Sequence, residues 1–170
     1  MEVIYKRRSI RSFTPDALKE DQLLECIKAG MNAPSAGNEQ PWHFIIIKNP
    51  EKLHEIPRFH NHASMLHEAT IAILICIDPS LEKHEQMAIQ DCAAATQNIL
   101  LSIHEQNYGA VWLGVYPREK RMKGLRYLLD IPEEIIPFSL IAIEPLLPRV
   151  IKSGLRYFSK SISAEFFTSV

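Results

Sequence analysis

The 170-residue chain lacks the glycine-rich signatures of nucleotide-binding loops. It contains only six glycines, and neither GxGxxG nor a Walker loop occurs among them. The serine-hydrolase motif GxSxG and the zinc-protease motif HExxH are also absent. We therefore expect neither a nicotinamide cofactor held by a Rossmann fingerprint nor hydrolysis by a serine at a strand-to-helix turn.

Cysteine is scarce as well. The three cysteines, Cys26, Cys76 and Cys92, lie far apart in apolar surroundings and form no CxxC pair. This spacing favours neither a disulfide framework nor a thiolate zinc site. We expect buried, reduced thiols in a cytoplasmic protein.

Long apolar runs and a strong net charge are missing too. The longest apolar run, at about residues 69–77, is too short to span a bilayer, and the charged first residues do not resemble a secretory signal. A net charge of -1 provides no overall attraction to nucleic acid or anionic membranes. We therefore expect neither nucleic acid nor a membrane as a partner. The 46% hydrophobic content is typical of one globular domain.

Hydrophobic periodicity predicts strands that alternate with helices. Strands are expected over residues 42–48, 70–77, 110–116 and 138–143, and long helices over 18–31, 82–107 and 118–129, with shorter helical pieces at 2–6, 50–58 and 62–69. Gly109 is expected to end the longest helix. By itself this alternation favours a parallel α/β sheet.

A basic segment near the start places four cations within six residues, from Lys6 to Arg11. If the segment is extended, Arg7, Ser9 and Arg11 share one side while Ile10 faces the core. Guanidinium groups match phosphate oxygens two at a time. The segment therefore indicates a local anion site, and a solvated basic turn is the alternative.

Two further stretches could contact a ligand. Residues 33–42, APSAGNEQPW, carry amides and hydroxyls on a loop, although an ordinary connection would explain them as well. Residues 91–98 and 110–114 are rich in small side chains, which permit close approach by a flat ligand or by another helix. Core packing explains this second pattern equally well.

In order along the chain, the motifs RRSIRSF, APSAGNEQPWHF, DCAAATQNILLSIHEQNYGAVWLG and LGVYPREKRMKGLRYLLDIPEEI resemble the FMN-dependent nitroreductase family, in a compact form. The resemblance covers about residues 3–145. It implies an α+β fold with a mixed, largely antiparallel central sheet flanked by helices, in an intertwined homodimer. It further implies an FMN-binding domain over 1–145 and a C-terminal extension over 146–170 that packs on the partner subunit.

The resemblance also implies roles for particular residues. Arg7, Arg8, Ser9 and Arg11 would contact the FMN phosphate and ribityl chain, and Arg156, or alternatively Arg149, would reach the phosphate from the tail. The isoalloxazine ring would be contacted by two sets of residues. The first set is Pro34, Ser35 and Ala36 of the partner subunit, with Asn38 and Gln40 nearby. The second set, on the far side of the ring, is Trp112, Leu113 and Gly114. No side chain is assigned as a catalytic acid or base.

The activity implied is an FMN-dependent oxidoreductase that takes hydride from NAD(P)H and reduces small planar acceptors, such as nitroaromatics or quinones, by a ping-pong mechanism. The short segment at 78–84 leaves no room for a substrate lid and argues against halotyrosine dehalogenation. Two alternatives remain open. One is a non-catalytic flavin-binding or storage protein, and the other is a metal-dependent hydrolase. The hydrolase would use a cluster formed by His54, His60, His62 and His67, which we expect on an exposed segment without a metal.

Overall fold

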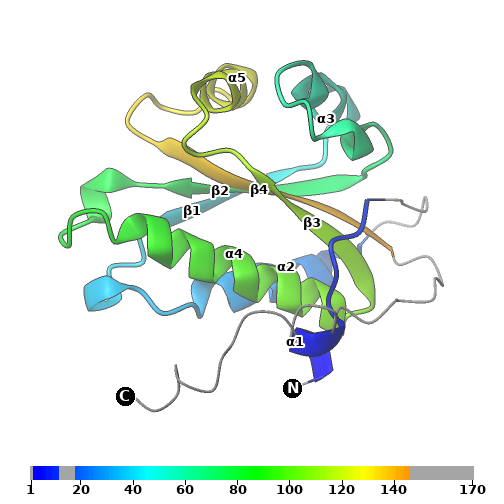
Figure 1. Ribbon diagram of the computed structural model, residues 1–170, viewed down its shortest axis with the longest axis horizontal. Coiled ribbons are helices and arrows are strands. Elements are labelled where there is room, and N and C mark those ends of the chain that lie inside the picture. Colours follow the sequence, from blue (N-terminus) through cyan, green and yellow to red (C-terminus); the bar gives the residue numbers. More distant parts are fainter. Residues whose placement is uncertain (1, 12–17, 146–170) are drawn as a thin grey trace, which may run out of the picture.

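The computed structural model describes residues 2–11 and 18–145 and is built around one antiparallel sheet (Figure 1). The strand order is β1-β2-β4-β3, with all three pairings antiparallel. The strands are β1 (Trp42–Ile47), β2 (Ile71–Ile77), β3 (Tyr108–Gly114) and β4 (Ile136–Pro145).

The α+β fold class is confirmed, and the parallel sheet favoured by the alternation of elements is wrong. The segments joining β1 to β2 and β3 to β4 each return the chain beside the strand it has just left, and this reverses its direction. Within the described residues, the only parallel contact is an isolated bridge between Ser9 and Ala110.

Helices cover both faces of the sheet, with α2 and α4 on one face and α3 and α5 on the other (Figure 1). In residues 2–11 and 18–145, none of the helices combines the length and apolar character that a membrane span requires. The α-helices are α1 (Glu2–Lys6), α2 (Glu20–Met31), α3 (Pro50–Glu55), α4 (Ala88–Glu105) and α5 (Glu119–Leu129). The 3-10 helices are η1 (Ala36–Asn38), η2 (Ile56–Arg58), η3 (Ser64–His67) and η4 (Pro79–Leu81).

The central strand β2 is buried on both of its faces. Its isoleucines at 71, 73, 75 and 77 pack in the core under α2 and α4, whereas Ala72, Leu74 and Cys76 pack in the second core under α3 and α5. Because side chains alternate across a strand, one continuous apolar run supplies both cores. The two cores fix the sheet between the two helical layers.

The long helix α4 begins later than the sequence predicts. It starts at Ala88, and the backbone N–H of Ala88 donates to the Glu82 carboxylate at 3.0 Å. Gln86 takes a left-handed conformation with φ of 67°, which interrupts any helix that begins at residue 82. Glu82 therefore caps α4 from outside the helix instead of forming its first turn.

The end of α4 also differs from the prediction. Asn107 takes the left-handed conformation there, with φ of 63°, and Gly109 already belongs to β3. Asparagine adopts this conformation more easily than most residues do. Gly109 is needed for a different reason, because a Cβ at this position would lie 2.9 Å from the Cβ of Ile10.

Candidate functional site

The basic segment lies along the outer edge of the sheet, beside β3. Ser9 bridges to Ala110, and the Ile10 N–H donates to the Ala110 carbonyl at 3.0 Å. Ile10 turns inward onto Gly109, as the alternation of residues predicts. Ser9 and Arg11 are exposed, so this edge presents their side chains to solvent.

The arginines of this edge have no carboxylate counterpart in the part of the chain that the structure describes. Among the described residues, no ion pair joins Arg7, Arg8 or Arg11 to an acidic side chain. Burial, and then the neighbouring charge of Arg8, lower the pKa of Arg7. Burial and the charges of this same segment lower the pKa of His104 in the last turn of α4. An anion placed here would relieve this mutual repulsion.

Arg8 has a different role from its neighbours. Its Nη1 donates to the carbonyls of Tyr5 and Arg7, both at 2.6 Å, so it folds back over the end of α1. Its Nε is buried and lacks a hydrogen-bond partner in the described part of the chain. Arg7 and Arg11 are therefore the cations best able to bind an anion.

The polar loop that includes η1 is held to the first turn of α4. The Ala36 N–H lies 3.2 Å from each carboxylate oxygen of Asp91, which is only 6% exposed. The Ser35 hydroxyl accepts from the Gln40 N–H at 3.0 Å. These contacts hold the loop while Pro34 remains exposed.

The outer part of this loop offers amide groups to solvent. Gln40 donates from its side-chain nitrogen to the Asn38 side-chain oxygen at 3.4 Å, and both side chains are exposed. Gly37, Asn38 and Gln40 all have positive φ values, between 51° and 56°. The loop therefore keeps a defined, strained shape of the kind that often occurs in binding loops.

The three predicted residues at the end of β3 have different environments. Trp112 is half-buried and meets Phe138 edge-on, with ring centroids 6.2 Å apart. Leu113 is buried in the opposite core, so only its backbone could face a ligand at this edge. Gly114 is exposed, and a Cβ placed there would meet no atom within 4 Å. This strand end therefore borders open space.

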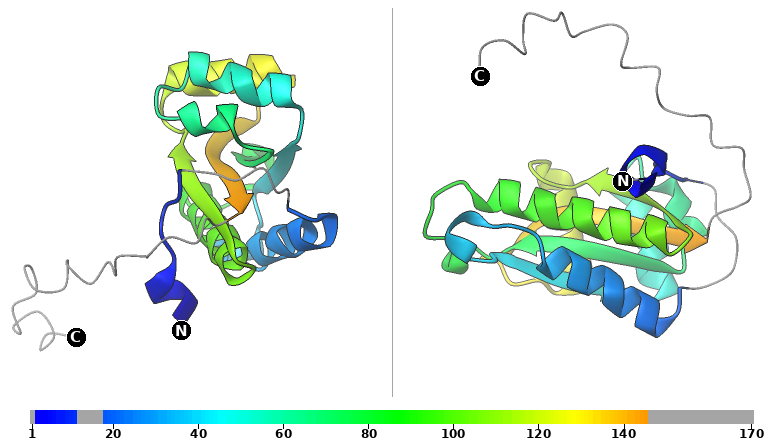
Figure 2. Two further views of the ribbon diagram at one scale, coloured as in Figure 1. Left: turned by 90° about the vertical axis from the view of Figure 1, so that its right-hand side faces the viewer. Right: turned by 90° about the horizontal axis from the view of Figure 1, so that it is seen from below.

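One chain does not bring all of these residues together. The arginines lie near the C-terminal end of α4, and the loop at 34–40 lies near its N-terminal end (Figures 1 and 2). At the ordinary rise per residue, roughly 20 Å of helix axis separates Asp91 from His104. The two motifs of one chain therefore occupy opposite ends of the same helical layer.

The histidines do not form a common cluster. His54, His62 and His67 are exposed as expected, but His60 is only 1% exposed and lies against the end of β3. The expectation of exposure is therefore wrong for His60. His54 and His67 have ring centroids 5.5 Å apart. Over residues 2–11 and 18–145, no group of three or more potential ligands is placed to hold a metal ion.

Sequence reasoning missed the contacts of two residues. An acid in the first turn of a helix is a common feature, which could have drawn attention to Asp91 but not to its partner Ala36. Nothing in the sequence separates His60 from its neighbouring histidines.

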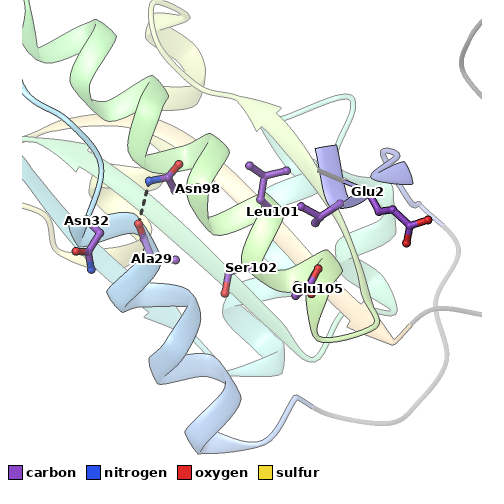
Figure 3. Close-up of a pocket in the computed structure, with 8 residues that line it drawn as sticks. Glu2, Ala29, Asn32, Asn98, Leu101, Ser102 and Glu105 are labelled. Carbon is purple, nitrogen blue, oxygen red and sulfur yellow. Dashed lines mark hydrogen bonds between the residues drawn. The ribbon is translucent and has the colours of Figure 1, made fainter. Parts of the chain in front are cut away.

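A groove of about 630 Å³ opens between α1, α2 and α4 (Figure 3). Val3, Leu101 and Ala29 contribute apolar walls, whereas Glu2 and Glu105 make its charged rim acidic. This acidic rim does not suit a phosphate. Beside the groove, Tyr5 and Met31 are large exposed apolar side chains.

The predicted phosphate contact from the tail falls outside the described residues. Arg149 and Arg156 belong to 146–170, as does the whole predicted extension. Both remain predictions.

Fold and site together define an α+β protein with an arginine-rich segment along one sheet edge. The model of the Nitroreductase family matches residues 4–143. The chain is 48% identical over 144 residues to an Archaeoglobus fulgidus protein provisionally named NADH dehydrogenase/NAD(P)H nitroreductase, covering 84% of this chain and 83% of the relative.

Solved structures agree with this match. A provisionally named NADH oxidase of Clostridium acetobutylicum superposes with a TM-score of 0.89 at 36% identity, covering 96% of this chain and 98% of the other. A provisionally named nitroreductase of Desulfovibrio desulfuricans, solved in complex with FMN, gives a TM-score of 0.74 at 27% identity, covering 88% and 90%. The chain belongs to the nitroreductase family.

Proposed function

We propose that the protein is an FMN-dependent oxidoreductase that takes hydride from NAD(P)H and reduces small planar acceptors, such as nitroaromatics or quinones, by a ping-pong mechanism. The observation that carries the proposal is the row of arginines at 7–11, which has no carboxylate partner among the described residues. Family membership and the names of the relatives supply the cofactor and the electron donor.

The residues present fit FMN. Arg7 and Arg11 form no ion pair with a described acidic residue, and Ser9 is an exposed hydroxyl beside them, which together suit a phosphate group. The open space in front of Gly114 and the half-buried Trp112 suit a flat ring. These residues would hold the phosphate and one side of the ring.

The loop at 34–40 would contact the same ring from the partner subunit. Because the loop lies at the opposite end of α4 from the arginines, the arginines and the loop of one chain are not side by side, which supports a contribution from a second chain. A two-fold axis across the α2 and α4 layer would bring the loop of one protomer to the arginines of the other. The groove beside α1, with Tyr5 and Met31 exposed nearby, supports an interface on this layer.

The chain contributes binding and orientation to the reaction. Flavin chemistry, when the cofactor is bound, supplies hydride acceptance and electron transfer to the acceptor. Arg7 and Arg11 would hold the phosphate, while Trp112, Gly114 and the partner's Pro34 would border the space in which a planar acceptor would stack. We assign no acid or base, since solvent can deliver the proton in an open pocket.

The hydrogen bonds that hold residues 78–84 support the proposal of an open pocket. The Lys83 N–H donates to the Glu39 carboxylate at 2.8 Å, and His84 pairs with the same carboxylate. This anchoring leaves no long segment there to close over a bulky substrate and supports small acceptors over halotyrosines.

A cytoplasmic location is part of the proposal. All three cysteines are free and buried. Burial raises the pKa of the Cys76 and Cys92 thiols to about 12, so these thiols are poorly reactive. Unpaired cysteines of this kind are typical of a reducing compartment.

The purified protein tests the proposal directly. We expect a yellow protein with a flavin absorption spectrum that oxidises NADH or NADPH when a quinone or nitroaromatic is present. A yellow protein without turnover would favour a storage role. A colourless protein that takes up no added FMN would refute the flavin assignment, and stoichiometric zinc would favour the hydrolase.

A further inference from the structure

Two side chains converge on the Gly114 carbonyl at the end of β3. The Nε2 of His60 lies 3.1 Å from this oxygen, and the Nη1 of Arg121 lies 2.5 Å from it. A carbonyl can only accept, so both nitrogens donate. His60 must therefore carry a proton on Nε2.

The second nitrogen of His60 is in a different situation. Its Nδ1 is buried and has no hydrogen-bond partner in the described part of the chain. Burial, and then the charge of Arg121, lower the pKa of His60. The charged or titratable groups that face it are Arg121 from α5 and His62 from its own connection. The neutral ring, protonated on Nε2, is thus the form that this site favours.

The packing of α5 against the segment that follows η2 brings the two donors together. Phe59 lies so close to Gly124 that a Cβ on Gly124 would be 2.5 Å from the ring. This contact sets α5 beside the residue that precedes His60. One donor therefore comes from α5 and the other from the segment after η2, and both reach the same carbonyl.

Gly114 faces two different environments. On one side its carbonyl receives both hydrogen bonds, and on the other side a Cβ would meet nothing within 4 Å. Fixing the carbonyl fixes the orientation of the backbone that borders the open space. We propose that His60 and Arg121 are positioning residues that hold the Leu113–Gly114 backbone in place for the flavin ring. This inference rests on the proposed function.

The test measures FMN binding to apoprotein, over about pH 5 to 8, the range in which histidine titrates. His60→Gln places an amide nitrogen near the Nε2 position but cannot titrate, whereas His60→Leu and Arg121→Gln remove a donor. Lys120→Gln is the matched control, because it removes an exposed cation from the same helix. Thermal unfolding of each apoprotein is recorded alongside.

We expect His60→Leu and Arg121→Gln each to weaken FMN binding about tenfold, the cost of one hydrogen bond, and to shift the absorption spectrum and midpoint potential of the bound flavin. Protonation of Nδ1 leaves the Nε2 hydrogen bond in place but sets a charged His60 against Arg121 at the same carbonyl, so wild-type binding should weaken as pH falls. The FMN phosphate titrates in the same range and should weaken binding equally in every variant. His60→Gln should bind as wild type does near neutral pH and should lose the part of the acid weakening that comes from His60. Lys120→Gln should behave as wild type throughout.

Distinct outcomes separate this inference from the proposed function. If the wild type binds no FMN, the proposed function fails. If the wild type binds FMN, but Arg121→Gln leaves affinity and spectrum unchanged and His60→Gln keeps the same acid weakening as wild type, only the positioning role is refuted. Arg121 is partly exposed, so its variant should fold even if His60→Leu does not. A variant that only lowers thermal stability, with an unchanged flavin spectrum, would indicate a merely structural role.

Discussion

At the scale of single residues, the proposed contact with the FMN phosphate depends on Arg7 and Arg11. Replacing both with alanine removes two charge-assisted contacts to a bound phosphate, each with a typical free energy of about 1.5–3 kcal/mol. We expect FMN affinity to fall at least about 100-fold, which fluorescence titration of the apoprotein measures directly. The purified double variant should be nearly colourless.

A matched control separates a specific contact from general electrostatics. Lys28→Ala with Lys120→Ala also removes two positive charges, from exposed positions on α2 and α5. This variant should retain FMN. Two results would contradict a specific phosphate contact. The arginine variant could retain its yellow colour, or both double variants could lose FMN equally.

The ionisation of Asp91 should make the stability of the protein depend on pH. Burial raises its pKa, and the nearby Glu39 and Glu82 add to the rise. The folded protein therefore binds this proton more readily than the unfolded chain does. The stability contributed by the group is fully present below the usual aspartate pKa and is lost as pH rises through its folded-state pKa.

The uncharged variant Asp91→Asn should remove this pH dependence. We expect its free energy of unfolding, relative to wild type, to improve as pH increases from about 4 to 7, as measured by urea denaturation. Asp91→Ala additionally leaves the Ala36 N–H without its partner, and it should weaken FMN binding more than Asn does. If the difference in free energy of unfolding between wild type and Asp91→Asn stays constant with pH, the raised pKa of Asp91 would be contradicted.

Among the elements, the contact of α5 with Phe59, the residue that follows η2, gives a clear prediction. In an open helix, Gly→Ala stabilises by roughly 1 kcal/mol, but at Gly124 the new methyl would lie 2.5 Å from the Phe59 ring. We expect overpacking to dominate and Gly124→Ala to lower the free energy of unfolding by about 1–3 kcal/mol in urea denaturation. Tyr127→Ala, at an 89% exposed position on the same helix, should change it by less than about 0.5 kcal/mol. If Gly124→Ala and Tyr127→Ala change the free energy of unfolding by similar amounts, overpacking against Phe59 would be contradicted.

The whole molecule is expected to be a homodimer with two shared sites. Arg7→Ala with Arg11→Ala disables the phosphate contact of one chain, and Pro34→Asp places an acid where the partner's ring is expected. Each homodimer should therefore lose FMN. A mixed dimer of the two variants, isolated by two different tags, has one site with both defects and one intact site.

We expect this mixed dimer to bind about half as much FMN per chain as wild type, measured from flavin absorbance. Recovery of this kind occurs only if each site takes its arginines from one chain and its loop from the other. A mixed dimer that binds no FMN, or a wild-type protein that sediments as a monomer with FMN bound, would contradict the shared site.

The sequence by itself determined the elements, the family and the candidate motifs. Apolar periodicity located the four strands and the main helices, and the inward direction of Ile10 followed from alternation alone. These features depend on neighbours within one element, where local geometry fixes which side chains share a face.

Only the tertiary structure decided which distant residues meet. The Ala36–Asp91 and His60–Gly114 contacts join residues 55 and 54 positions apart, and no local pattern specifies them. The antiparallel pairing of the strands, and the placement of the arginines and the polar loop at opposite ends of α4, were likewise set by packing two helical layers onto the sheet. Such contacts form because burial of both faces selects one arrangement of the elements, and this choice depends on the whole chain at once.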